Sequence, residues 1–187
     1  MADADTHHLD EAALDAGLDH IRSAPTDGGE LQLIVRRPAE NEREVLDEAE
    51  LDQESGLVGD TWKLRGSRRT EDGSSHPDMQ LNIMNSRVAE LIAQDPGRWA
   101  LAGDQLYIDL DISEDNLPAW TELAIGSAVI QVTDQPHTGC AKFQERFGAE
   151  ARRWANTDAG KKLRLRGMNA RVVQPGTIRR GDEVRKL

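Results

Sequence analysis

The chain has 187 residues, a length that suits one globular domain and is short for two. Hydrophobic residues make up 37% and charged residues 30%, as in ordinary globular proteins, and no apolar run is long enough to span a membrane. Because Cys140 is the single cysteine, an internal disulfide framework and a structural zinc site built on cysteine pairs are both excluded.

The net charge of -11 is unevenly distributed. Residues 1–139 contain 10 Lys and Arg against 29 Asp and Glu, whereas residues 140–187 contain 13 against 5. The acidic balance argues against non-specific binding of nucleic acid, and no specific nucleic-acid partner is expected. The cationic region that starts at Cys140 is suited to holding a small anion, although a solvated basic face explains it equally well.

The N-terminus, "MADADTHHLDEAALDAG", is acidic. A secretory signal needs a basic start followed by an apolar stretch, and transit peptides avoid acidic residues. We therefore expect a cytoplasmic protein that uses no membrane and whose thiol is kept reduced.

Hydrophobic spacing predicts an N-terminal helical appendage followed by a β-rich domain. Leu9, Leu14, Leu18 and Ile21 share one helical face, so residues 1–29 form the appendage and residues 30–187 the second domain. Within that domain, segments rich in branched residues predict strands at residues 31–38, 43–51, 79–84, 105–112, 121–125, 127–133, 170–176 and 178–187.

Helices are few in the second domain. Asn85 is placed to cap a helix over residues 86–94, and residues 139–163 hold one or two more. The Gly-Asp pairs, such as Gly103-Asp104, are interpreted as tight turns. Many short strands with few helices predict a mainly β fold with helical inserts, a closed or partly open β-barrel.

Cys140 lies between a loop and a short helix. Thr138 is a candidate helix cap, and Phe143 and Phe147 mark a buried helical face that ends at Gly148. Cys140 then falls in the first helical turn, where unpaired N–H groups favour a thiolate, helped by Lys142 or Arg146. The alternative is a small buried thiol.

A reactive thiolate at this position has three possible uses: it can attack a substrate, carry sulfur as a persulfide, or ligate a soft metal. His137, three residues earlier, is the nearest candidate base for the first use. Without a second cysteine, sulfur received by Cys140 must pass to another molecule.

Several segments together resemble the MOSC domain family, named after the C-terminal domain of molybdenum-cofactor sulfurases. They are "GLVGDTW", "SHPDMQLNIMNSRVAELI", "LAGDQLYIDLDISEDNLPAWTELAIGSAVIQVT", "VTDQPHTGCAKFQERFG" and "RLRGMNARVVQPGTIRRGDEV". The resemblance covers roughly residues 30 to 185 and is strongest to small bacterial stand-alone members. It implies a barrel related to the β-barrel domain of pyruvate kinase.

The resemblance implies two functions for Cys140, which matches the hallmark cysteine of the family. In the first, it carries sulfur for cofactor or metal-sulfur centres, supplied by a cysteine desulfurase partner that holds pyridoxal phosphate; no pyridoxal phosphate is expected within this chain. In the second, it ligates molybdenum in a molybdopterin-dependent reductase of N-hydroxylated compounds, with an electron-transfer partner. A non-catalytic binding domain with a packed thiol is the third interpretation.

The resemblance also suggests which residues would hold a pterin or another small-molecule anion. They are His137, Thr138, Lys142, Arg146, Arg171 and Asn116. His137 stands where many relatives carry arginine, and Arg171 and Asn116 occupy positions similar to those of the family. His76 is expected to be exposed and idle.

Overall fold

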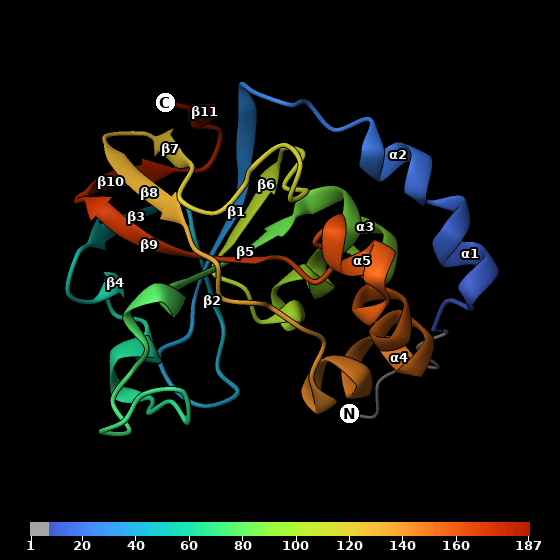
Figure 1. The fold of residues 1–187 in the computed structure, drawn as a ribbon, viewed down its shortest axis with the longest axis horizontal. Coiled ribbons are helices and arrows are strands. Elements are labelled where there is room, and N and C mark those ends of the chain that lie inside the picture. Colours follow the sequence, from blue (N-terminus) through green and yellow to red (C-terminus); the bar gives the residue numbers. More distant parts are fainter. Residues whose placement is uncertain (1–7) are drawn as a thin grey trace.

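The computed structural model describes residues 8–187, in which seven strands close into a barrel (Figure 1). Neighbouring strands follow the order β11-β7-β8-β9-β5-β6-β1, β1 pairs with β11 to close the ring, and β2 extends the sheet from β1. A second sheet has the order β10-β3-β4. The strands are β1 (Gly29–Arg36), β2 (Glu44–Leu46), β3 (Glu48–Asp52), β4 (Gly56–Leu57), β5 (Leu81–Asn85), β6 (Leu106–Asp109), β7 (Glu122–Ile125), β8 (Ala128–Val132), β9 (Met168–Gln174), β10 (Gly176–Arg179) and β11 (Glu183–Lys186).

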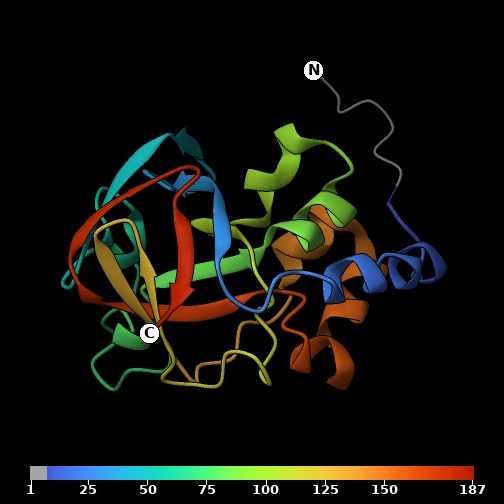
Figure 2. The same cartoon turned by 90° about the horizontal axis from the view of Figure 1, so that it is seen from above.

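Helices gather on one side of the barrel (Figures 1 and 2). They are α1 (Glu11–Ala16), α2 (Leu18–Arg22), α3 (Ser86–Ala93), α4 (Ala141–Asn156) and α5 (Asp158–Lys162), with the 3-10 turn η3 (Pro96–Ala102). Two further 3-10 turns, η1 (Thr61–Leu64) and η2 (Pro77–Met79), lie apart from this layer, on the side of β4 (Figure 1). The strands pair antiparallel except β5 and β6, which are parallel because α3 and η3 form the crossover between them.

The barrel and the helical layer each have a hydrophobic core, and the alternation of side chains along the strands supplies both. On β5, Ile83 points into the barrel while its neighbour Met84 packs among the helices. On β6, Leu106 and Ile108 belong to the barrel core and Tyr107 to the helical core. Successive side chains of a strand face opposite sides, so one strand contributes to two cores.

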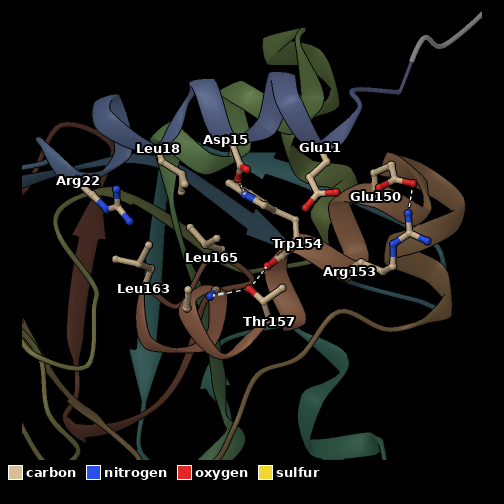
Figure 3. Close-up of a pocket in the computed structure, with 12 residues that line it drawn as sticks. Glu11, Asp15, Leu18, Arg22, Glu150, Arg153, Trp154, Thr157, Leu163 and Leu165 are labelled. Atoms are coloured by element: carbon tan, nitrogen blue, oxygen red, sulfur yellow. Dashed lines mark hydrogen bonds and ion pairs between the residues drawn. The ribbon is translucent and has the colours of Figure 1, made fainter.

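The N-terminal helices cover the helical layer. α1 and α2 are separated at Gly17, and Leu14 is fully buried with residues of α3 and α4. The indole Nε1 of Trp154 donates to Asp15 Oδ1 at 3.0 Å. A cavity of about 280 Å³ lies between these helices and α4–α5, with Leu18 and Leu165 in its wall (Figure 3). The domain boundary at residues 29–30 stays a prediction.

The predicted fold class is confirmed, with three local differences. The segment 43–51 divides into β2 and β3, and the segment 178–187 into the end of β10 and β11; the members of each pair belong to different sheets. The strand β4 was not predicted. The Asn85 cap is confirmed, because its side chain accepts a hydrogen bond from the Arg87 backbone at the start of α3. In the described part of the chain, no helix is both long and apolar enough to cross a bilayer.

Candidate functional site

Cys140 is exposed at the start of α4. It is itself the N-cap residue of this helix, with an extended backbone, and its side chain makes no capping hydrogen bond. The prediction that Thr138 caps the helix is therefore wrong by two residues. Phe143 and Phe147 are buried as predicted, with ring centroids 5.1 Å apart.

Gly148 interrupts α4 rather than ending it. Its φ of 94° is non-helical, so the first helical run stops where the sequence indicates, and a second run continues to Asn156. The continuation matters for the site, because it brings the far end of α4 back to the loop before Cys140.

The backbone immediately before Cys140 is held by that far end. The Gly139 N–H donates to Asn156 Oδ1 at 2.8 Å, and the Gly139 carbonyl accepts from Asn156 Nδ2 at 3.1 Å and from Arg152 Nε at 3.2 Å. A Cβ at position 139 would lie only 3.2 Å from Arg152 Cγ, so glycine permits this close approach. Cys140 is thus exposed while its neighbour is fixed.

His137 belongs to a buried charged cluster. Its Nε2 lies 2.9 Å from Asp104 Oδ1, and Arg166 Nη1 donates to Asp104 Oδ2 at 2.6 Å. Asp104 is fully buried, and the side chains of His137 and Arg166 are 14% and 6% exposed. The Arg166 guanidinium also lies over the Phe143 ring, 4.9 Å from its centroid. The cluster therefore reaches the first turn of α4.

The pKa values in this cluster follow from burial and neighbouring charge. Burial alone would raise the pKa of Asp104, but Arg166 and His137 outweigh it, so the pKa lies below its ordinary value. Burial lowers the pKa of His137, and repulsion by Arg166 lowers it further against the attraction of Asp104. Burial and Arg166 therefore disfavour the charged form of His137, while the contact with Asp104 holds the ring in place.

Asp104 and Arg166 were not among the predicted site residues. The pair Gly103-Asp104 was interpreted as turn chemistry, and Gly103 does have a positive φ of 91°. Arg166 lies in the quoted segment "RLRGMNARVV", and the next residue, Gly167, has φ of 110° with the His137 ring 3.1 Å from where its Cβ would be. Both short motifs can be recognised in the sequence, but nothing in the sequence indicates that Asp104 and Arg166 come into contact.

Lys142 and Arg146 follow Cys140 on α4 and reach two loops opposite. Lys142 Nζ lies 3.0 Å from Glu40 Oε1 and 3.2 Å from Asn41 Oδ1. Arg146 Nη1 donates to the Leu101 carbonyl at 2.7 Å. The structure therefore places both predicted residues near Cys140, on the side of α4 that faces the loops at 40–43 and 101–104.

Asn116 has a structural role away from these residues. Its amide donates to the carbonyls of Thr26 and Asp111 at 2.9 and 2.6 Å, and its oxygen accepts from Lys186 at 3.0 Å. Both polar atoms of the Asn116 side chain are thus engaged in hydrogen bonds that stabilise a turn. Among residues 8–187, none of these hydrogen bonds involves His137.

Arg171 lies on β9 and is likewise engaged elsewhere. It donates to Gln131 and to Asp78, and its guanidinium lies 5.5 Å from the centroid of the Trp120 ring. The prediction that His76 is exposed and idle is wrong. His76 is half-buried, and its Nδ1 accepts a hydrogen bond from the Asp78 N–H at the start of η2.

A cavity of about 380 Å³ opens beside the loop that precedes Cys140. His137 and Thr138 line it together with Met168 and Gly167, and the cations Lys161 and Arg164 lie in its wall. Glu114 and Asp134 add negative charge to the same wall. The cavity wall therefore contains charges of both signs together with apolar surface. Thr138, in this wall, is two residues before Cys140 in the sequence.

The fold and the exposed cysteine together define a seven-stranded barrel protein with a single thiol at a helix start. The chain belongs to the MOSC domain family, whose model matches residues 80–185. This family is associated with the molybdenum cofactor. No curated protein matches the chain.

Solved structures of other MOSC-type proteins share the fold. The YuaD protein of Bacillus subtilis is 14% identical with a TM-score of 0.58, over 83% of this chain and 93% of that one. YiiM of Escherichia coli is 21% identical with a TM-score of 0.53, over 84% and 69%. YiiM of Geobacillus stearothermophilus is 17% identical with a TM-score of 0.51, over 87% and 73%. At these identities the likeness concerns the fold alone.

Proposed function

We propose that this protein is a sulfur carrier that holds a persulfide on Cys140. The observation that carries the proposal is the combination of an exposed thiol with a fixed backbone: the Cys140 side chain makes no capping bond, while Asn156 and Arg152 hold Gly139. A packed thiol, the third interpretation above, would be buried instead.

The transfer needs a donor and an acceptor outside this chain. The Cys140 thiolate attacks the terminal sulfur of a persulfide on a cysteine desulfurase, the donor sulfur leaves as a thiolate, and Cys140 gains one sulfur atom. A nucleophile on the acceptor then takes that sulfur and releases the Cys140 thiolate. His137 acts here as a positioning residue, because its ring is bound to buried Asp104. We place this exchange in the cytoplasm, where thiols stay reduced.

Persulfide loading tests the proposal directly. The protein is mixed with a cysteine desulfurase and cysteine, persulfides are trapped by alkylation, and the intact mass is measured. We expect one added sulfur atom on the wild type and none on Cys140→Ser. Arg180→Gln, an exposed substitution near Asp47, is the control and loads like the wild type. Absence of the added mass on the wild type would reject sulfur carriage.

The cavity beside His137 favours a second candidate, a molybdenum-cofactor reductase. The residues fit such a group: exposed Cys140 supplies a soft thiolate ligand, and Lys161 and Arg164 in the cavity wall suit an anionic pterin. Lys142 and Arg146 would add positive charge on α4. The bound cofactor would supply electron transfer to an N-hydroxylated substrate at molybdenum, with electrons from a partner protein.

Molybdenum analysis separates the two candidates. Protein purified from a host that makes the cofactor is compared with Cys140→Ser from the same host. Stoichiometric metal that is lost in the variant supports the reductase. Metal absent from both, together with persulfide on the wild type, supports the carrier.

A further inference from the structure

Three arginines donate hydrogen bonds to backbone carbonyls of the turn at 101–104. The carbonyl of Leu101 accepts from Arg146 at 2.7 Å, that of Ala102 from Arg166 at 2.9 Å, and that of Gly103 from Arg37 at 2.9 Å. These arginines come from α4, from the segment before β9 and from the residue that follows β1. The backbone of this turn is therefore held by hydrogen bonds from three guanidinium groups that surround it.

A fourth arginine, Arg43, approaches the same turn from the loop before β2. A Cβ built on Gly103 would lie 3.6 Å from Arg43 Nη2 and 3.9 Å from Arg146 Nη1. Apart from the neighbouring residues of the turn, no other described heavy atom lies within 4 Å of that point. Because Gly103 has no side chain, the space between the two guanidinium groups is left open.

The positive charge at this point is not balanced. Two buried carboxylates serve the cluster, and each is already engaged: Asp60 binds Arg37, and Asp104 binds Arg166. Within residues 8–187, neither Arg43 nor Arg146 has a carboxylate within ion-pair distance. The Nε of Arg43 is buried and has no hydrogen-bond partner among the described residues.

Such an arrangement costs free energy unless an anion joins it. Burial lowers the pKa of Arg43, and repulsion by Arg146 and Arg37 lowers it further. Like charges in a partly dry site repel strongly, and an unpartnered buried donor adds to the cost. Arg43 Nη1 donates to the Glu42 carbonyl at 2.6 Å and Arg146 Nη1 to the Leu101 carbonyl, so each guanidinium has one backbone acceptor and, among the described residues, no paired carboxylate.

We propose that Arg43 and Arg146 bind a tetrahedral oxyanion over Gly103. The guanidinium group presents its donors in a planar fork that matches the oxygens of phosphate or sulfate, and two forks from different elements grip such a group from two sides. The oxyanion is either free inorganic phosphate or sulfate, or the phosphate end of a larger ligand. The site lies six residues after Cys140 on α4, about 9 Å away along the helix axis. It shares Arg146 with the cofactor candidate described above, and it adds Arg43 from a different loop.

Calorimetric titration with defined anions tests the site. Inorganic phosphate, sulfate and the monoester glycerol 3-phosphate are titrated into the full chain at low ionic strength, where screening is weak. We expect saturable binding of one anion per chain. Arg43→Gln should weaken it by at least about tenfold, since charge-assisted hydrogen bonds are lost.

Matched variants make the result specific. Arg179→Gln removes a cation that pairs with Glu48 on the opposite sheet, and it should bind phosphate as the wild type does. Arg146→Lys keeps the charge but loses the fork, so its binding should be intermediate. The thermal melting temperature of each variant without anion confirms that it is folded.

Binding of free phosphate that is lost in Arg43→Gln supports a free oxyanion, and binding of the monoester alone, lost in the same variant, supports a larger ligand. No saturable binding, or equal binding by Arg43→Gln and the wild type, overturns the site. Cys140→Ser should bind anion normally, so failure of sulfur carriage and failure of this site are distinguished.

Discussion

Asp104 is the residue that joins the charges around the Cys140 loop. It is fully buried and accepts from Arg166 while contacting His137, so one carboxylate balances a buried guanidinium and orients an imidazole. A buried ion pair contributes little when intact, because desolvation offsets the attraction. Its removal is costly, since one charge is left without a partner.

Asp104→Asn tests this dependence. The amide has nearly the same shape but no charge, so Arg166 is left buried and uncompensated, and we expect the free energy of unfolding to fall by about 3–5 kcal/mol. Denaturant titration followed by tryptophan fluorescence measures the change. Asp47→Asn, which removes the exposed partner of Arg180, is the control and should leave the midpoint unchanged. Equal, small effects of both substitutions would contradict the role given to Asp104.

At the level of elements, α4 places Cys140 at its start and also stabilises the backbone of the residue before it, Gly139. Its first residue follows Cys140, its break at Gly148 redirects the chain, and its last residue, Asn156, binds both backbone groups of Gly139. Because the helix begins and ends at the same loop, its two ends stabilise each other. A continuous straight helix of this length would be about 24 Å long and would carry its far end away from the loop.

Asn156→Ala should loosen this connection. The Gly139 N–H loses its acceptor and the carbonyl one of its two donors, so the unfolding free energy should fall by about 1–3 kcal/mol. Amide hydrogen exchange of Gly139, followed by NMR, should become faster. Glu145→Gln is the control, since Glu145 is exposed on the same helix. Unchanged exchange at Gly139 in Asn156→Ala would show that the loop is held by other contacts.

The whole molecule is a barrel and a helical layer that share strands. Met84 and Tyr107 on the barrel strands pack in the helical core, and Leu14 of the N-terminal α1 is buried in that same core. The N-terminal α1 therefore contributes a side chain to the core that α3 and α4 form over the barrel.

Leu14→Ala measures how strongly this side chain couples α1 to the barrel. Loss of a fully buried leucine leaves a cavity, and we expect a decrease of about 2–5 kcal/mol in the free energy of unfolding. Far-UV circular dichroism and tryptophan fluorescence should report one shared transition at lower denaturant concentration, and Leu187→Ala, at an exposed position, should unfold like the wild type. An early loss of helix with an unshifted barrel transition would instead support an independent appendage.

The sequence by itself determined most of the strands, the α3 cap and the position of Cys140 at a helix start. These features depend on neighbours two to four residues apart: alternation of branched residues, a capping asparagine at 85, and the spacing of Phe143 and Phe147. Only the tertiary structure decided which charges meet. Asp104 lies 33 residues from His137 and 62 from Arg166. Arg43 and Arg146 meet only because the fold brings the loop before β2 and helix α4 to one turn. Local periodicity contains no information about such distant pairs, which depend on barrel closure and on the packing of α4 against it.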